Sequence, residues 1–282
     1  MAPLRFGYNT NGFPHHRLED VLRILADLGY EGVALTLDVQ HLDPFHASAG
    51  EVAGIAGLLG RLRLEPVVET GARFILDPRR KHEPNLLSSR PEERGRRLDF
   101  LRLACRTAVD LGARVVSLWS GRPPEGEGRK ELEVRLVEGL RTVCGEAAAS
   151  GLGVALEPEP GMLIETLPEF DRIRALVDRP NLGLCLDVGH LYCTGETPVA
   201  PRVRERSGQL LTVHLEDSPR GRHEHRMFGE GDVDLAEALL GFRSSGYSGL
   251  LNVELSRHGH EAPVAAERAI RALRDEERKL PG

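Results

Sequence analysis

The chain carries GVALEPEPGMLIETLPEFDRIRALVDRPNLGLCLDV at residues 153–188, in which two short apolar runs flank a stretch with helical periodicity. Near-continuous apolar runs are typical of strands that are covered on both faces, as in parallel sheets. The same alternation recurs along the chain, and the strand-like runs are residues 4–9, 32–38, 65–71, 114–120, 153–159, 182–188, 210–217 and 250–256. Eight such units in 282 residues match the size and rhythm of a (β/α)8 TIM barrel of the α/β class, which is the fold we predict.

An open, doubly wound α/β sheet is the alternative architecture, because alternation alone does not prove that the sheet closes. The first strand leads into YNTNGFP at residues 8–14, which lacks the GxGxxG pattern of dinucleotide-binding sheets. No Ser-, Gly- or Pro-rich linker divides the chain, so we predict a single domain over residues 1–282. The sixth unit is the weakest, and its segment 198–209 predicts only one or two helical turns. The long irregular segments 77–91 and 218–232 are expected at the active face of the barrel.

The composition excludes several classes of protein. Apolar residues make up 40% and charged residues 28%, which is typical of globular and not of disordered chains. The 37 basic and 43 acidic side chains give a net charge of −6, so nothing in the charge balance favours nucleic acid or an anionic membrane. The sequence shows no membrane-spanning run, no secretory signal pattern and no CxxC motif among its four cysteines. These features predict a cytoplasmic protein with reduced thiols.

Acidic and imidazole side chains gather at the ends of the last four predicted strands, namely Glu157, Asp187, His214 and Glu254. The carboxyl ends of barrel strands meet at one face, and a carboxylate beside buried apolar residues is costly unless it is paired or bound to a cation. Three carboxylates and one imidazole form a mostly hard set of ligands, which favours Mn²⁺, Co²⁺, Mg²⁺ or Zn²⁺. Salt-bridged strand ends are the structural alternative, and Glu159 is the second choice for the ligand from its strand.

These residues fall within short motifs, D-x-x-H at 187–190, H-x-x-D at 214–217 and G-E-G-D at 229–232, which precede the glutamate of the last strand. Together the motifs resemble the xylose isomerase-like TIM-barrel superfamily over nearly the whole chain. Members of this superfamily include ketose 3-epimerases, hydroxypyruvate isomerase, inosose dehydratase and endonuclease IV.

The resemblance implies roles for individual residues. One divalent metal ion would be held by the four strand-end residues Glu157, Asp187, His214 and Glu254. The two glutamates of this set would also form the acid/base pair. His190 would contact the substrate, and so would an arginine after the H-x-x-D motif, for which Arg220 and Arg222 are the candidates.

This chemistry suits a small polyhydroxylated carbonyl substrate. A cation that chelates the carbonyl stabilises the enediolate that forms when the α proton leaves, and two carboxylates can remove and return that proton. We therefore predict a metal-dependent isomerase or epimerase of a sugar or sugar phosphate. The alternatives are a dehydratase of the inosose or dehydroshikimate type and a barrel that binds a metabolite without turnover. Superfamily analogy suggests a homo-oligomer, either a dimer or a tetramer.

An endonuclease IV-like phosphodiesterase is a further alternative. The loop RHEHRMFGEGD at residues 222–232 resembles that enzyme, so His223 and His225 are candidates for a second metal site. However, the family has an aspartate where His223 stands. The ends of strands three and four also lack the ligand histidines of that enzyme and carry Glu69, Thr70, Ser117 and Trp119 instead. The absence of a basic row also argues against DNA as a substrate.

Several further side chains have two possible roles each. Trp119 could stack on a sugar ring or cap the barrel, and Asn9 could bind substrate hydroxyls or serve as a turn residue. His41 and His46 follow the second strand and could line the pocket. The basic run at residues 79–82 is interpreted as a solvated loop, with recognition of a substrate phosphate or carboxylate as the alternative.

Overall fold

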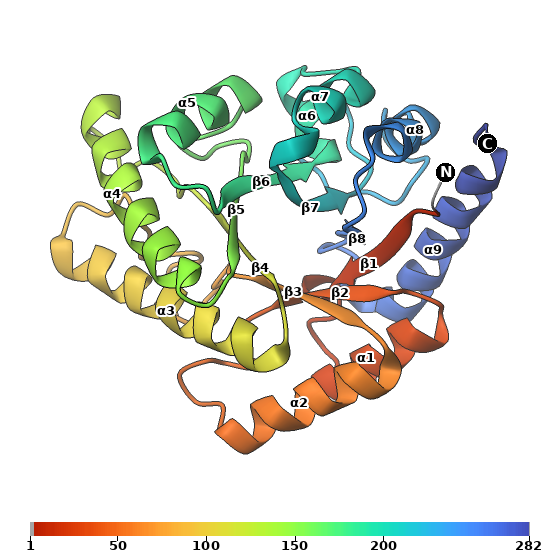
Figure 1. The fold of residues 1–282 in the computed structure, drawn as a ribbon, viewed down its shortest axis with the longest axis horizontal. Coiled ribbons are helices and arrows are strands. Elements are labelled where there is room, and N and C mark those ends of the chain that lie inside the picture. The colour runs from red at the N-terminus through yellow and green to blue at the C-terminus, as the bar shows by residue number, and fades with distance from the viewer. Residues whose placement is uncertain (1–2, 282) are drawn as a thin grey trace.

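The computed structural model describes residues 3–281, in which parallel strands form a closed barrel in the order β1 to β8, as Figure 1 shows. The strands are β1 (Arg5–Asn9), β2 (Gly32–Thr36), β3 (Glu65–Glu69), β4 (Val115–Trp119), β5 (Gly153–Glu157), β6 (Leu182–Asp187), β7 (Leu210–Leu215) and β8 (Leu250–Val253). The last strand pairs in parallel with the first, with Tyr8 opposite Val253, and this pairing closes the ring. The predicted TIM barrel is confirmed, and the open doubly wound sheet is excluded.

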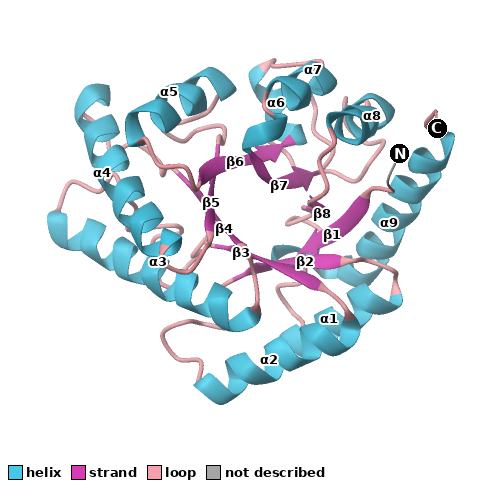
Figure 2. Cartoon of the chain, in the orientation of Figure 1, coloured by secondary structure: helices cyan, strands magenta, loops and turns pink. Residues whose placement is uncertain are grey.

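Helices surround the ring of strands on the outside, as Figure 2 shows. They are α1 (Leu18–Asp27), α2 (Ala49–Leu62), α3 (Pro91–Leu111), α4 (Arg129–Ala148), α5 (Leu167–Val177), α6 (Val188–Thr194), α7 (Val199–Glu205), α8 (Leu235–Ser245) and α9 (Ala262–Lys279). Each covers the barrel with one apolar face; in α1, for example, Val21, Leu22 and Leu25 are fully buried. The core therefore lies between the helices and the outer side of the sheet, as well as inside the ring.

The sixth unit contains one helix more than the sequence analysis predicts. The one or two turns expected at residues 198–209 are present as α7, but α6 begins directly after β6. The side chain of Asp187 accepts a hydrogen bond from the backbone N–H of His190 at 3.0 Å and so caps α6 at its start. Gly195 ends this helix in the left-handed conformation, with a φ of 77°.

All strands except β1 stop earlier than the apolar runs predict, and the polar residues of the site lie where the strands stop. Glu157 is the last residue of β5, and Asp187 is the last residue of β6. Glu254 follows directly after β8. Because the strands are parallel neighbours in a closed ring, these positions meet at one end of the barrel.

Asp217 organises the long loop that follows β7. Its carboxylate accepts hydrogen bonds from the backbone N–H groups of Ser218 and Gly229 at 2.8 Å and of Val233 at 3.0 Å. The aspartate of the H-x-x-D motif is therefore a loop anchor, and it fixes the two ends of the segment that carries His223 and His225.

A carboxylate of the last helix is hydrogen-bonded to the residue that precedes the first strand. Glu277 of α9 accepts a hydrogen bond from the backbone N–H of Leu4 at 2.8 Å, and it also pairs with Arg274 at 2.9 Å. Figure 1 accordingly shows the two ends of the chain on the same side of the barrel. Among residues 3–281, no helix is both long enough and apolar enough to cross a membrane.

Candidate active site

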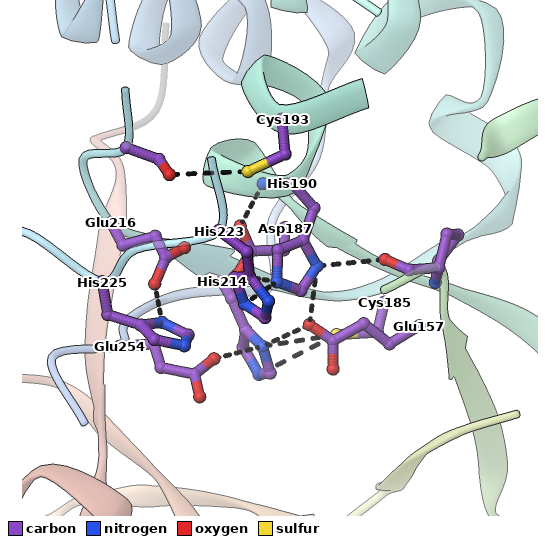
Figure 3. A network of polar contacts seen from close by, with 12 residues as sticks. Glu157, Cys185, Asp187, His190, Cys193, His214, Glu216, His223, His225 and Glu254 are labelled. Carbon is purple, nitrogen blue, oxygen red and sulfur yellow. Dashed lines mark hydrogen bonds and ion pairs between the residues drawn. The ribbon is translucent and has the colours of Figure 1, made fainter. Parts of the chain in front are cut away.

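The four predicted ligand residues come together at the carboxyl end of the barrel, as Figure 3 shows. They are Glu157, Asp187, His214 and Glu254, and one ligand atom of each lies within 4.8 Å of every other. The site is largely removed from solvent, since Asp187 is only 2% exposed and His214 only 1%. The strand-end pattern in the sequence therefore corresponds to one compact cluster.

His214 is the centre of this cluster. Its Nδ1 lies 3.1 Å from Oε1 of Glu157 and 3.0 Å from Oε2 of Glu254, and its Nε2 lies 3.1 Å from Oε1 of Glu69. Burial alone would favour the neutral ring, but the surrounding carboxylates raise the pKa of His214 well above its usual range. One imidazole thus faces three carboxylates.

The carboxylates of the cluster perturb one another. Burial raises the pKa of Glu157, and burial together with the charge of Glu254 raises the pKa of Asp187 to about 7. Burial also acts on Glu254, but the positive charge of His214 outweighs it and lowers the pKa of this carboxyl group. Buried acids held this close to one another are costly unless a positive charge offsets them.

The residues present fit a divalent cation. Among residues 3–281, no lysine or arginine forms an ion pair with Glu157, Asp187 or Glu254. The Oδ2 atom of Asp187 is buried and has no hydrogen-bond partner. Carboxylate and imidazole donors suit Mg²⁺, Mn²⁺, Co²⁺ and Zn²⁺. The ion-pair partners of these carboxylates are the imidazole rings of His190 and His214. Strand ends paired with lysine or arginine, the structural alternative, are therefore not found among residues 3–281.

Glu69 is a site residue that the sequence analysis does not assign to the cluster. It ends β3, is 7% exposed, and contacts both His214 and the hydroxyl group of Ser117. The signal that could have identified it is the one used for the candidate metal ligands, a carboxylate at the end of an apolar strand. Cys185 also approaches His214, at 3.8 Å, but burial raises the pKa of its thiol and so favours the protonated form, a poor ligand.

A second group of ligand-type side chains lies beside the first. His190, Glu216 and His223 each offer a ligand atom within 4.8 Å of the others, and Nε2 of His190 lies 3.1 Å from Nε2 of His223. His225 contacts Glu216 through Nδ1, as Figure 3 shows. Burial lowers the pKa of His223 and of His225 to about 4, so both rings are neutral near pH 7. Of the two predicted second-site histidines, His223 thus contacts His190, and His225 packs against His223 at 4.9 Å between ring centroids.

Gly189 makes room for this second group. A Cβ atom at this position would lie 2.4 Å from Oε1 of Glu216, which is closer than atoms in proteins approach. The same Oε1 atom is buried and has no hydrogen-bond partner. The glycine of the D-x-x-H motif is therefore required for the close approach of Glu216 to α6.

A cavity of about 470 Å³ opens onto the cluster. Trp119 lines it, in edge contact with His82 at 5.3 Å between ring centroids, and the buried guanidinium group of Arg97 lies 4.5 Å from the Trp119 centroid. The indole is thus held on two sides. Glu159 also lines the cavity, although β5 has ended before it, and burial raises its pKa well above the usual range.

Other candidates lie away from this cavity. Asn9 is buried and accepts a hydrogen bond from the hydroxyl group of Thr36 at 2.7 Å, and the cavity is lined by Asn11 instead. His41 is bound to the carbonyl oxygen of His16 at 3.0 Å, and exposed His46 pairs with Asp43 at 2.8 Å. Neither histidine lines the cavity.

The two candidate arginines after the H-x-x-D motif also lie outside the cavity lining, which is a correction to their expected place. Arg220 stacks on Tyr192 at 4.9 Å and donates to Thr197 at 3.0 Å, and Arg222 is exposed. The physical reason is a second contact within this loop. Asp232 accepts a hydrogen bond from the backbone N–H of Arg220 at 2.8 Å, and the side chain of Arg220 then lies against Tyr192 and Thr197. The arginines that do line the cavity are Arg73 and Arg257.

A closed (β/α)8 barrel with acids and an imidazole at its carboxyl end defines the class of protein, and the comparison with known families agrees. Residues 22–276 match the Xylose isomerase-like TIM barrel family, and the chain belongs to that family.

The proteins to which the chain is similar include sugar epimerases. The chain is 25% identical over 247 residues to the L-ribulose-5-phosphate 3-epimerase UlaE of Shigella flexneri serotype 5b, covering 86% of this chain and 84% of the relative. Its fold is similar to that of the D-allulose 3-epimerase from Methylomonas sp. solved with D-allulose, with a TM-score of 0.76, 20% identity and 98% coverage of both chains. It is also similar to the IolI protein solved with a zinc atom, with a TM-score of 0.78, 19% identity, and coverage of 99% of this chain and 100% of that chain.

Proposed function

We propose that the protein is a divalent-metal-dependent epimerase or isomerase of a small polyhydroxylated ketone, a sugar or sugar phosphate. The observation that carries the proposal is the convergence of Glu157 and Glu254 on His214 at the buried end of a sugar-sized cavity. The similarity to epimerases of ketoses and of a ketose phosphate supports the same class of reaction.

We assign the cation to Glu157, Asp187, His214 and Glu254. A divalent cation held there supplies stabilisation of the negative charge that develops on the carbonyl oxygen. The structural neighbour IolI, which was solved with a zinc atom, supports a metal ion in a barrel of this fold. We do not require a second ion, and in our assignment His223 and His225 stay neutral and bind substrate hydroxyl groups together with His190.

Two carboxylates of the protein carry out the proposed proton transfer. Glu157 reaches the cavity from β5, and Glu254 reaches it from the loop after β8, so two separate carboxylates are available to remove and return the α proton. Asn11 donates to Glu254 at 2.7 Å and holds that carboxylate in place. Trp119 offers an apolar face to the carbon skeleton.

The deciding experiment follows solvent deuterium. The purified protein is loaded with Mn²⁺, Co²⁺, Mg²⁺ or Zn²⁺ and incubated in D₂O with ketoses and their phosphates, and the carbon that acquires deuterium is identified by NMR. Incorporation next to the carbonyl, lost with a chelator and restored by metal, is the expected result. Loss of water with a new conjugated-carbonyl absorbance would assign the dehydratase alternative. Binding without exchange would leave only a metabolite-binding barrel.

A further inference from the structure

Three cationic side chains line the exposed edge of the cavity. Arg73 and Lys81 belong to the loop after β3, and Arg257 belongs to the loop after β8. Lys81 and Arg257 are exposed, whereas the cluster residues Glu157 and His214 are buried. Acids therefore gather at the inner end of the cavity and cations at its outer edge.

The two arginines are held in place by backbone carbonyl groups. Arg73 donates to the carbonyl oxygen of Asn11 at 2.9 Å, and Arg257 donates to that of His223 at 3.0 Å. Each guanidinium group keeps further N–H donors after these bonds, because it carries five in all. The cationic edge is thus tied to the two loops that also carry active-site residues.

These cations are weakly neutralised by the protein itself. Arg73 lies 3.7 Å from Asp38, and within residues 3–281 neither Lys81 nor Arg257 has an ion-pair partner. Partial desolvation at the cavity edge, followed by the charges of Arg73 and Arg257, lowers the pKa of Lys81, although the carboxyl group of Glu159 acts in the opposite direction. The three positive charges therefore act on one another across the same small space.

The neighbouring basic residues do not share this property. Arg80 is paired with Asp77 at 2.7 Å and with Glu93 at 3.3 Å, and Arg79 is exposed outside the cavity lining. The basic run in the sequence thus divides into a solvated part and one cation, Lys81, that faces the cavity.

We propose that Arg73, Lys81 and Arg257 bind a terminal phosphate group of the substrate, so that the enzyme acts on a phosphorylated ketose in preference to the free sugar. This inference rests on the proposed function, because it places the reacting carbonyl at the acidic end and the phosphate at the cationic edge. A phosphate carries nearly two negative charges and three terminal oxygens, which matches three cations better than a single carboxylate does.

The test compares phosphorylated and free ketoses on the metal-loaded protein. The ratio of kcat/KM for a ketopentose 5-phosphate to that for the same free ketopentose is measured in the wild type, Lys81→Met, Arg257→Met and, as a matched control, Arg79→Met. We expect the ratio to fall about tenfold or more in each edge variant and to stay constant in the control. Equal efficiency with the free ketose and an unchanged ratio would overturn the inference but leave the proposed function standing, as would a preference for a sugar acid.

A binding measurement separates the two proposals when no substrate is turned over. Inorganic phosphate is titrated into the metal-loaded protein by calorimetry at constant ionic strength. Binding that weakens about tenfold in the Lys81→Met, Arg257→Met double variant, and not in Arg79→Met, supports the phosphate site even if the epimerase assignment fails. Identical phosphate affinity in all variants would overturn the phosphate site, whatever the activity.

Discussion

The side-chain amide of Asn11 donates a hydrogen bond to Oε1 of Glu254 at 2.7 Å, while Oε2 of the same carboxylate faces His214 at 3.0 Å. Asn11 lies just after the first strand, and Glu254 lies just after the last. The seam at which the barrel closes therefore fixes the orientation of a proposed catalytic carboxylate.

Replacing Asn11 with alanine should lower kcat about 10- to 100-fold with a smaller change in KM, because Glu254 loses the partner that orients it. Metal content should stay the same, since Asn11 is not one of the proposed ligands. Steady-state kinetics and elemental analysis check both statements. A variant with unchanged kcat would show that the hydrogen bond does not position the carboxylate.

Replacing Glu254 with glutamine should abolish turnover, by about a thousandfold or more, and weaken metal binding, because the change removes both a negative ligand and a proton acceptor. Glu230→Gln is the matched control, since Glu230 is an exposed acid outside the cavity lining. Activity and metal content are measured on both proteins. Near-normal activity with a full metal content in Glu254→Gln would contradict the assigned role.

Replacing His223 with alanine should leave the metal stoichiometry at one ion per chain, because the proposed ligand set does not include this histidine. KM should rise, since a side chain that lines the cavity is lost. Elemental analysis of the purified variant decides the matter. A fall from two ions to one would instead assign a second metal to the group formed with His190 and Glu216.

Replacing Gly189 with alanine should destabilise the protein by about 1–3 kcal/mol, because the new methyl group would overlap the buried carboxylate of Glu216. Gly145 in the exposed part of α4 has open space around it, so Gly145→Ala should be neutral or stabilising. Chemical denaturation compares the two variants. Equal stabilities would mean that α6 can shift without cost.

The pairing of Glu277 with Leu4 and Arg274 should make stability depend on pH. Burial opposes ionisation of Glu277, but its hydrogen bonds and the nearby arginine lower its pKa below the usual value in the folded protein. The stabilisation is therefore present above the pKa of the unfolded chain and is lost as the pH falls through the lowered pKa. Glu277→Gln should cost about 1 kcal/mol near pH 7 and progressively less in acid, as unfolding curves at several pH values would show.

The barrel and the four-residue cluster could be predicted because both depend on periodic features. Strand ends of a closed parallel barrel share one rim, so Glu157 and Asp187 had to be neighbours once closure was assumed. The same rule applies to Glu69 at the end of the third strand, but the predicted site used only residues from the last four strands. The helix α6 was missed because its start depends on a side-chain cap and not on apolar periodicity.

The outer edge of the cavity could not be predicted in this way. Arg73 and Arg257 lie in irregular loops, where no repeat relates sequence position to side-chain direction. Conversely, Arg220 follows the H-x-x-D motif but is turned aside by the hydrogen bond from its backbone to Asp232. Loop anchors of this kind involve single contacts that only a three-dimensional structure reveals.

When β8 pairs with β1, it also brings Glu254 into the site, because this glutamate follows the closing strand directly. During synthesis on a ribosome, the first seven strands therefore emerge before Glu254, and the set of proposed ligands is still incomplete. The growing polypeptide cannot assemble the full cluster before its final strand has docked, so the four proposed metal ligands come together only in the finished barrel.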